Sequence, residues 1–452
     1  MTHPDLTIVG GGLAGTEAAW QAAQRGLSVH LYEMRPGKST GAHLTSDLAE
    51  LICSNSFGST LPDRASGLLK NEMRLLGSLL LDCAQRTALP AGNALAVDRE
   101  LFSQRVTGKV TSHPNIEIFR TEISKIPQGP AIIATGPLTS DKLSQSIATL
   151  TGENQLYFFD AIAPIVTADS INMKVAFRGS RYNAMENDDG DYINCPLTEE
   201  EYDSFVEGLL SGERILLHSF ETEIEQGINA GTKQFFEGCL PVEIIAHRGR
   251  QALAFGPMRP TGLVDPNTGR WPHAIVQLRQ DNLAGSLYNL VGFQTNLTFS
   301  EQTRIFRKVP GLEMAEFARY GQMHRNTFLA APILLLPTLQ FRGRPDLFFA
   351  GQLTGVEGYM GNIATGLLAG INAAHLLHGT ESIVFPETTM IGALIHYITH
   401  AAMRDFQPMK ANFGILPTLS SAKRMDKRER AGHFMERAQN DMEVFLSRTG
   451  IL

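Results

Sequence analysis

The sequence predicts an α/β fold in which a parallel sheet is interrupted by an inserted α+β domain and followed by a helical C-terminal segment. Strand and helix patterns alternate over residues 1–156, as they do in parallel sheets. Shorter strands and turn residues replace that alternation over residues 157–324, and a strand, a Gly-rich turn and a long small-residue helix follow. The chain has 452 residues, 43% of them hydrophobic and 19% charged, which is typical of a globular protein of two or three domains.

The first strand–turn–helix unit contains a turn with the G-x-G-x-x-G spacing of dinucleotide-binding proteins. The strand at Leu6–Val9 leads into this turn, and the second strand ends at Glu33, whose carboxylate would accept hydrogen bonds from ribose hydroxyls. Gly10 makes the tight turn, Gly12 lets the backbone approach a pyrophosphate, and Gly15 lets the helix pack closely on the strand. This order of elements favours a nucleotide site over a structural glycine turn. The predicted contacts are Gly10, Gly11, Gly12, Leu13, Ala14, Gly15 and Glu33.

Two later turns are predicted to approach the same nucleotide. The strand Ala131–Ala134 ends near Gly136, which is either a backbone contact with the nucleotide or a simple exit from the strand. The strand Asp346–Ala350 leads into Gly351 and Gln352, ahead of a helix whose N-terminal N–H groups would face an anion. Glycine turns this far apart along the chain favour FAD, a long cofactor held at both ends, over a nicotinamide.

These turns predict a Rossmann-type FAD-binding domain of the glutathione-reductase-like class, formed by two separated parts of the chain. We assign residues 1–156 to its first part, 157–324 to an inserted substrate domain, and 325–452 to its second part with the C-terminal helices. Related flavoproteins often carry Gly-Asp in the late turn, so Gln352 leaves the acid contact to the ribityl chain absent or replaced by an amide. A helix is also predicted over Ser421–Leu446, with a basic end that is either a solvated face or a contact with phosphates.

Composition and charge exclude several classes of protein. The net charge of −7 argues against a uniformly basic nucleic-acid binder, although not against a local basic groove. No apolar run is long enough to span a membrane, and the first predicted strand begins too close to Met1 to leave room for a signal peptide. We therefore expect a cytoplasmic protein without membrane contact. Its four cysteines lack the C-x-x-C spacing of zinc or dithiol sites, so we expect reduced thiols and no metal.

Two of the four cysteines lie in loops where functional groups concentrate. Cys53 lies in ELICSNSFGS, shortly after Glu33, and Cys239 lies in FFEGCLPVE, beside glycine and proline. Context alone leaves each of them open between a reactive thiol and an inert buried one. Cys83 and Cys195 have no such context, and we expect them to be buried and inert.

Eight segments between residue 10 and about residue 417 carry a family resemblance. They are GGGLAGTEAAWQ, ELICSNSFGS, NALAVDRELFS, FEGCLPVE, RGRQALAFGPMRP, NLVGFQTNL, GYMGNIATGLLAGINAA and PMKANFGILP. With these segments the chain resembles the TrmFO family, the folate- and FAD-dependent tRNA (uracil-5-)-methyltransferases within the GidA-like flavoproteins. The GidA proteins themselves have a different cysteine loop and a longer C-terminal helical region, which favours the uracil methyltransferases.

This resemblance implies that the protein forms 5-methyluridine at the T-loop position, uracil-54, of tRNA. It implies Cys239 as the nucleophile that adds to C6 of uracil and so makes C5 reactive. Reduced FAD would pass on the one-carbon unit of methylenetetrahydrofolate, and NADH or NADPH would reduce the FAD. Cys53, expected near the flavin, would act as general base or protect the flavin adduct. His247, Arg248 and Arg250 are candidates, by sequence proximity, for lowering the pKa of the Cys239 thiol.

Two other enzymatic functions stay open at this point, besides a non-enzymatic, tRNA-chaperoning role. One is a GidA-like enzyme that modifies the wobble uridine of tRNA, and the other is an FAD oxidoreductase that acts on a small molecule without RNA. A uridine in a folded tRNA must leave its stack to reach a flavin, so an aromatic partner is expected, with Phe293, Tyr288 and Tyr359 as candidates. The sequence predicts no particular oligomeric state.

Overall fold

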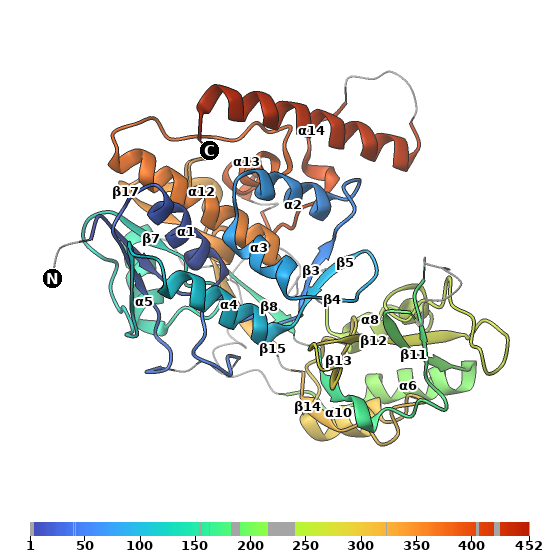
Figure 1. The fold of residues 1–452 in the computed structure, drawn as a ribbon. Coiled ribbons are helices and arrows are strands. Elements are labelled where there is room, and N and C mark those ends of the chain that lie inside the picture. The colour runs from blue at the N-terminus through green and yellow to red at the C-terminus, as the bar shows by residue number, and fades with distance from the viewer. Residues whose placement is uncertain are drawn as a thin grey trace.

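The computed structural model of the chain describes most of its 452 residues (Figure 1). The described residues are 4–38, 40, 42–152, 156–161, 163–181, 190–215, 240–321, 323–403, 406–419 and 425–451. Side chains are described for all of these except residues 156–161, 323–327 and 427. Within these residues the chain folds into two parts, each built on a six-stranded sheet with its own apolar core.

The first sheet is parallel except at one edge. Its strand order is β16-β17-β7-β1-β2-β6, in which only β16 pairs antiparallel with its neighbour. The strands are β1 (Leu6–Val9), β2 (Val29–Tyr32), β6 (Ile116–Phe119), β7 (Ala131–Ile133), β16 (Gln340–Phe341) and β17 (Arg344–Phe349). Apolar runs such as LTIV in β1 and AII in β7 suit strands that are covered on both faces. Leu347 of β17 lies opposite Ala131 of β7, so the late part of the chain completes the sheet that the early part begins.

Two helices beside this sheet pack almost backbone to backbone. They are α1 (Leu13–Gln24) and α12 (Tyr359–Leu377), which lie side by side in Figure 1. A Cβ atom on Gly366 would lie 2.2 Å from the carbonyl oxygen of Ala14, and one on Gly370 would lie 2.5 Å from that of Ala18. The glycines of α12 therefore set the separation of the two helices. Because the contacts advance in step along both helices, α1 and α12 run parallel and their N-termini face the same side of the sheet.

The remaining helices of the first part cover the sheet and a smaller one. They are α2 (Ala65–Leu75), α3 (Leu79–Arg86), α4 (Arg99–Thr111), α5 (Asp141–Thr151), α11 (Ala331–Leu334) and α13 (Met390–His400). The small antiparallel sheet consists of β3 (Ser56–Ser59), β4 (Ala88–Leu89) and β5 (Ala94–Val97), and it lies between the two parts in Figure 1. Helix α4 is capped at its N-terminus by Asp98, whose carboxylate accepts a hydrogen bond from Leu101 N.

The second sheet is antiparallel and has its own helices. Its strand order is β10-β11-β12-β13-β9-β14. The strands are β9 (Ile165–Thr167), β10 (Phe177–Gly179), β11 (Tyr192–Leu197), β12 (Ala274–Gln280), β13 (Leu287–Leu290) and β14 (Phe317–Arg319). The helices are α6 (Glu199–Ser211), α8 (Val242–Ala246), α9 (Ala252–Phe255) and α10 (Phe299–Phe306), with a 3-10 turn, η1 (Ala168–Ser170). Two antiparallel strands, β8 (Leu156–Ala161) and β15 (Met323–Phe328), connect this part to the first.

The C-terminal region is less helical than the sequence suggests. Helix α14 (Lys427–Thr449) starts after Asp426, whose carboxylate accepts hydrogen bonds from Arg428 N and Glu429 N, and not at the predicted Ser421. Between α13 and α14 the described residues are irregular apart from a 3-10 turn, η6 (Phe413–Ile415). The predicted α/β class, with its inserted α+β region and helical C-terminal segment, is confirmed.

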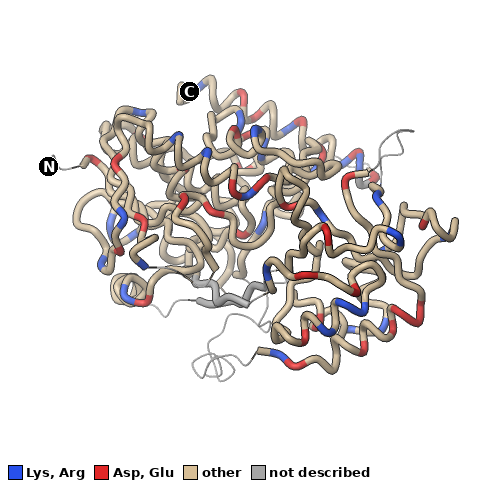
Figure 2. The backbone as a smooth tube through the Cα atoms, turned by 60° about the horizontal axis from the view of Figure 1, so that its bottom comes forward, with Lys and Arg blue, Asp and Glu red and all other residues tan. Residues whose placement is uncertain are grey.

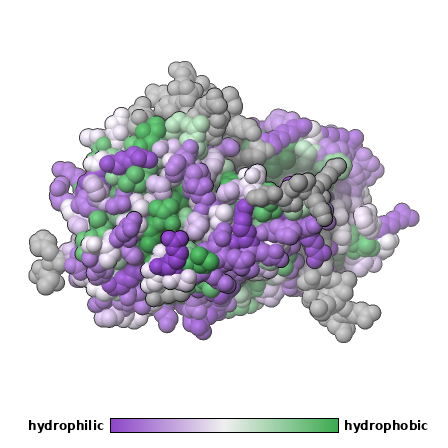
Figure 3. Space-filling model, turned by 90° about the horizontal axis from the view of Figure 1, so that it is seen from above, coloured by the Kyte–Doolittle hydropathy of each residue, from purple (hydrophilic) through white to green (hydrophobic). Residues whose placement is uncertain are grey.

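The surface carries charges of both signs. In the view of Figure 2 basic and acidic residues are interspersed over both parts. The face seen in Figure 3 is mostly hydrophilic, with small separate apolar areas. Among the described residues, no helix combines the length and the apolar character needed to cross a bilayer.

Candidate active site

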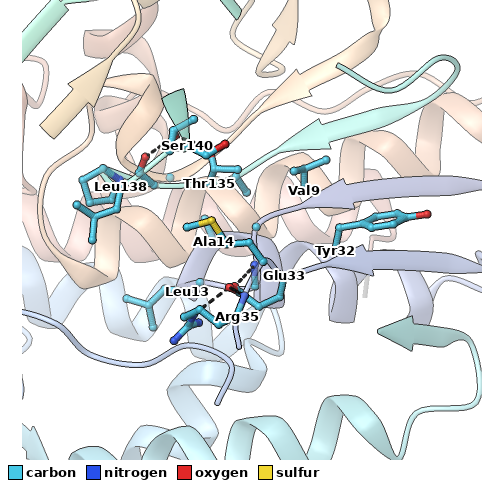
Figure 4. Close-up of a pocket in the computed structure, with 18 of the residues that line it drawn as sticks. Val9, Leu13, Ala14, Tyr32, Glu33, Arg35, Thr135, Leu138 and Ser140 are labelled. Atoms are coloured by element: carbon cyan, nitrogen blue, oxygen red, sulfur yellow. Dashed lines mark hydrogen bonds and ion pairs between the residues drawn. The ribbon is translucent and has the colours of Figure 1, made fainter. Parts of the chain in front are cut away.

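A pocket lies where the C-terminal ends of strands β1 and β7 meet the N-terminal ends of helices α1 and α12. Nine of the ten residues predicted to bind a cofactor line it, and the tenth, Gly15, lies behind it. Those nine are Gly10, Gly11, Gly12, Leu13, Ala14, Glu33, Gly136, Gly351 and Gln352. Turns from positions 10, 136 and 351 of the sequence thus meet at one pocket. In Figure 4, Glu33 and Arg35 lie on one side of Ala14, and Thr135, Leu138 and Ser140 lie on the other.

The three glycines of the first turn have different surroundings. Gly10 has a φ of +109°, and a Cβ on it would lie 2.5 Å from the carbonyl oxygen of Ala134. A Cβ on Gly15 would lie 1.9 Å from the carbonyl oxygen of Gly10, so this glycine serves the packing of α1 on the turn. A Cβ on Gly12 would meet nothing within 4 Å. Gly12 therefore borders open space in the pocket, where a methyl group would collide only with a bound ligand.

Glu33 is held by a buried ion pair that sequence reasoning missed. Its Oε2 accepts a hydrogen bond from Gly11 N (3.0 Å), and its Oε1 accepts one from Arg35 Nε (2.9 Å), as Figure 4 shows. Arg35 also donates from Nη1 to Glu50 Oε2 at 2.8 Å. Burial acts to raise the pKa of Glu33, but the hydrogen bonds and the charge of Arg35 outweigh it and hold the pKa below its usual range. The carboxylate is therefore charged and fixed at the edge of the pocket.

The other end of the pocket is formed by the turn before α12. This turn, η4 (Gly351–Thr354), is held by a hydrogen bond from Gly351 N to Thr365 Oγ1 at 2.8 Å. Gln352 stands where related flavoproteins often carry an acid, and its Nε2 donates to Glu357 Oε2 at 3.0 Å. Asn362 lines the pocket, and its Oδ1 is buried without a hydrogen-bond partner among the described residues. An acceptor left in this state marks a place where a ligand donor fits.

Tyr359 connects the pocket to the loop of Cys53. Its side chain lines the pocket. Its hydroxyl accepts a hydrogen bond from Cys53 N (3.0 Å) and donates one to Ser54 O (2.7 Å). Burial raises the pKa of Tyr359, so the hydroxyl keeps the proton that it donates. The half-buried Cys53 is thereby placed next to the N-terminus of α12.

Three further side chains hold the Cys53 loop from other directions. Arg99 donates from Nη2 to Cys53 O (3.0 Å) and forms an ion pair with Asp281 (2.9 Å). The Asn55 side chain donates to Gln280 O (2.9 Å), so the loop is also tied to β12 of the second part. The buried Lys70 donates from Nζ to Phe57 O (2.6 Å) and to two neighbouring carbonyls. The sequence contains no local signal for the contacts of Arg99 and Asn55, because their partners lie 46 and 225 residues away along the chain.

Cys239 lies outside the described residues, so its position relative to the pocket stays a prediction. The chain that follows it is firmly held, because Val242 N donates to Gln294 O at 2.7 Å. The buried Glu243 accepts from Thr295 Oγ1 (2.9 Å) and Asn296 N (2.7 Å).

The side chains proposed to act on the Cys239 thiol have partners of their own. Arg250 pairs with Asp203, and the His247 ring lies 2.7 Å from Arg214 Nη2. The two other described cysteines are fully buried, as expected. Burial raises the pKa of the Cys83 thiol to about 11 and also raises that of Cys195. Of the expected stacking partners, Tyr288 and Phe293 are buried in the second core, so neither is available to a base.

The pocket fits FAD by its own geometry. It joins a helix N-terminus with open space at Gly12, a charged Glu33 at one side, and an unsatisfied acceptor on Asn362 at the other. A dinucleotide that spans these groups ends beside Tyr359 and the Cys53 loop. The residues present therefore suit a flavin dinucleotide whose ring system lies near Cys53.

Comparison with known proteins identifies close relatives. Residues 5–381 match the family described as glucose inhibited division protein A. The methylenetetrahydrofolate–tRNA-(uracil-5-)-methyltransferase TrmFO of Halalkalibacterium halodurans is 53% identical over 444 residues, which cover 97% of this chain and 99% of that relative. The protein of the same name from Symbiobacterium thermophilum is 55% identical over 439 residues, covering 97% and 96%. Among solved structures, Aquifex aeolicus GidA superposes with a TM-score of 0.70 at 17% identity, over 100% of this chain and 76% of that one.

Proposed function

Because this chain belongs to the GidA family, and within it to the TrmFO methyltransferases, we propose that it methylates C5 of a uridine in tRNA with carbon from methylenetetrahydrofolate. The target we propose is uracil-54 of the T-loop, the cofactor is FAD, and the reductant is NADH or NADPH, in the cytoplasm. The observation that carries this proposal is Tyr359, which lines the cofactor pocket and also binds the backbone of Cys53. It brings a thiol to the place where a flavin ring would lie.

The residues of the chain would divide the work between binding and chemistry. Bound FAD would supply the electrons and carry the one-carbon unit to the base. The turn at Gly10–Gly12 and the N-terminus of α1 would hold the pyrophosphate, and Glu33 would hold the ribose. Cys239 would add to C6 of uracil, because C5 alone is too weak a nucleophile for a one-carbon transfer. Cys53, fixed by Tyr359 and Arg99, would move a proton or shield the flavin from water.

Transfer of labelled carbon tests this function directly. The purified protein with FAD receives unmodified tRNA transcript, NADH or NADPH, and methylenetetrahydrofolate labelled in its methylene group. We expect label in 5-methyluridine of the tRNA, and none when S-adenosylmethionine replaces the folate. If the flavin is reduced but no label reaches the T-loop, the proposal fails, and an oxidoreductase acting on a small molecule accounts better for the pocket. Label at the wobble position would instead favour the GidA-like activity.

Single-cysteine variants test the roles of the two thiols. Cys239→Ala and Cys53→Ala are expected to keep FAD and to lose methyl transfer. The matched control is Cys83→Ala, which removes a thiol that burial keeps protonated and away from the pocket. Full activity of Cys239→Ala would refute its role as nucleophile, whatever the result with Cys53.

A further inference from the structure

We infer that Arg279 and Arg319 form a binding site for a phosphate or carboxylate group of a substrate, next to the Cys53 loop. This inference rests on the proposed function, because it assigns an additional binding group to the same active site. Both arginines belong to the second sheet, Arg279 to β12 and Arg319 to the end of β14. The second sheet would thus contribute the contacts that hold a charged substrate beside the cofactor pocket of the first.

Each arginine reaches across to a loop of the first part. Arg279 donates from Nε to Asn55 Oδ1 at 2.8 Å, two residues along the chain from Cys53. Arg319 donates from Nη2 to Ala42 O at 3.1 Å, beside His43, which lines the cofactor pocket. Both guanidinium groups are close enough to Arg99 and Asp281 to interact with them electrostatically. The two cations therefore flank the Cys53 loop from the side of the second sheet.

The positive charge of this group is not balanced by the described residues. Asp281 is the carboxylate that forms an ion pair here, and its partner is Arg99. Arg279, only 7% exposed, has a neutral amide as its hydrogen-bond partner, and Arg319 has a neutral carbonyl. Burial and the charge of Arg35 lower the pKa of the nearby His43 to about 4, so this ring adds no charge at neutral pH. Two guanidinium charges are left without an anion within the part of the chain that the structure describes.

An arrangement of this kind points to an anionic ligand. Burying a cation without an anionic partner costs free energy. If these positions served stability alone, apolar residues there would stabilise the fold more than arginine does. Arginine keeps its charge at all physiological pH values, and its planar fork binds phosphate and carboxylate with two parallel hydrogen bonds. Toward the residues that the structure describes, each arginine donates from a single nitrogen, so its remaining N–H groups are not used by these residues.

Two participants in the proposed reaction bring such a group. One is the phosphate backbone next to the target uridine, and the other is the glutamate tail of the folate. The two sources share an oxyanion that accepts paired N–H donors, and they differ in how binding depends on salt. Contacts with a polynucleotide release condensed counterions, whereas a carboxylate of a small molecule does not.

Binding measurements that do not need turnover test the inference. The variants are Arg279→Gln and Arg319→Gln, and the matched control is Arg342→Gln, an exposed arginine at the turn between β16 and β17. Holoenzyme is titrated with labelled tRNA transcript between ~0.05 and ~0.2 M KCl, and separately with tetrahydrofolate under anaerobic conditions. FAD content, read from the flavin absorbance, reports whether each variant is folded.

The two sources predict different results. A phosphate site predicts a tRNA Kd raised at least about tenfold and a salt slope reduced by about one per arginine, with tetrahydrofolate binding unchanged. A carboxylate site predicts the reverse, with the loss confined to tetrahydrofolate. The inference is overturned if both affinities stay within about twofold of the wild type, or if Arg342→Gln loses as much.

A second pair of variants covers the case in which the glutamine variants do not hold FAD. Arg279→Lys and Arg319→Lys keep the charge but lose the planar fork. We expect them to hold FAD and to lose about three- to tenfold in the affected affinity. FAD loss with unchanged substrate affinity in the lysine variants would show a structural role and overturn the inference. If the wild type binds tRNA through these arginines but transfers no label, the proposed function fails while the anion site stands.

Discussion

The contrast between Gly12 and Gly15 leads to a prediction that separates cofactor space from protein packing. In Gly12→Ala the added methyl group meets nothing within 4 Å, so the apoprotein accommodates it. Gly12 is the N-cap of α1, where alanine costs about 1 kcal/mol relative to glycine, and the reduced freedom of the unfolded chain offsets about 0.4–1 kcal/mol of this. We therefore expect the free energy of unfolding of the apoprotein to change by less than about 1 kcal/mol.

The same methyl group takes the space that the pyrophosphate needs. Losing one charged hydrogen bond between the helix N-terminus and a phosphate costs about 1.5–3 kcal/mol, which corresponds to a Kd for FAD that is about 10- to 150-fold weaker. In Gly15→Ala the methyl group would lie 1.9 Å from the carbonyl oxygen of Gly10, well inside van der Waals contact. The turn must then open, and we expect the apoprotein to lose about 3 kcal/mol of stability or more.

Two measurements on each apoprotein check these values. Urea unfolding gives the stability without cofactor, and quenching of flavin fluorescence on titration gives the Kd for FAD. The reasoning would be refuted if Gly12→Ala binds FAD as tightly as the wild type. It would equally be refuted if Gly15→Ala is as stable as the wild type without FAD.

Three further predictions concern the groups around the pocket. Because the pKa of Glu33 lies below its usual value in the folded protein, its stabilising contribution is present above about pH 4.5 and is lost as the pH falls below that value. The urea midpoint of Glu33→Gln should therefore fall less steeply with acid than that of the wild type. An unchanged acid dependence would contradict this prediction. Tyr359→Phe removes two hydrogen bonds to the Cys53 loop, so iodoacetamide should alkylate Cys53 at least about twice as fast while FAD is retained. An unchanged alkylation rate would show that Tyr359 does not restrain the loop. Lys70→Met leaves the carbonyls of residues 57–59 without their donor, so we expect a loss of about 2 kcal/mol or more in urea unfolding, and a neutral result would show that water replaces the ammonium group.

Much of the fold was predictable because its signals are local. The strands of the first sheet are short apolar runs followed by glycine turns, and the observed β1, β7 and β17 match the predicted ranges within two residues. Glycine also marks places where backbones approach closely. The glycine turns at Gly10 and Gly351 could therefore be recognised in the sequence, and both line the same pocket. The start of α14 was predicted wrongly, because the basic residues before Asp426 extend the helical pattern while the capping carboxylate of Asp426 sets the actual start.

The contacts around Cys53 were not predictable from one sequence. Arg99 and Asp281 pair across a separation of 182 residues, and nothing in the neighbourhood of either residue signals the other. Arg35 follows Glu33 closely, yet a surface arginine would look the same in the sequence. Tyr288 and Phe293 were candidates for stacking with a base, but an aromatic residue in a strand or turn is as often part of a core, and both are buried in one. Long-range ion pairs and the burial of single side chains can be identified only once the folded structure is known.

The close packing of α1 against α12 has a consequence for how the protein is made. The first nucleotide turn leaves the ribosome early, but β17 and α12, which complete the sheet and close the pocket, are among the last elements to be synthesised. At about 5–20 residues per second, the stretch between β7 and β17 takes roughly 10–40 s to appear. During that time α1 lacks the glycine face that covers it, and its apolar side stays open to water or to chaperones. Cofactor capture is then a late event of biosynthesis, and a chain truncated before residue 351 should emerge without flavin.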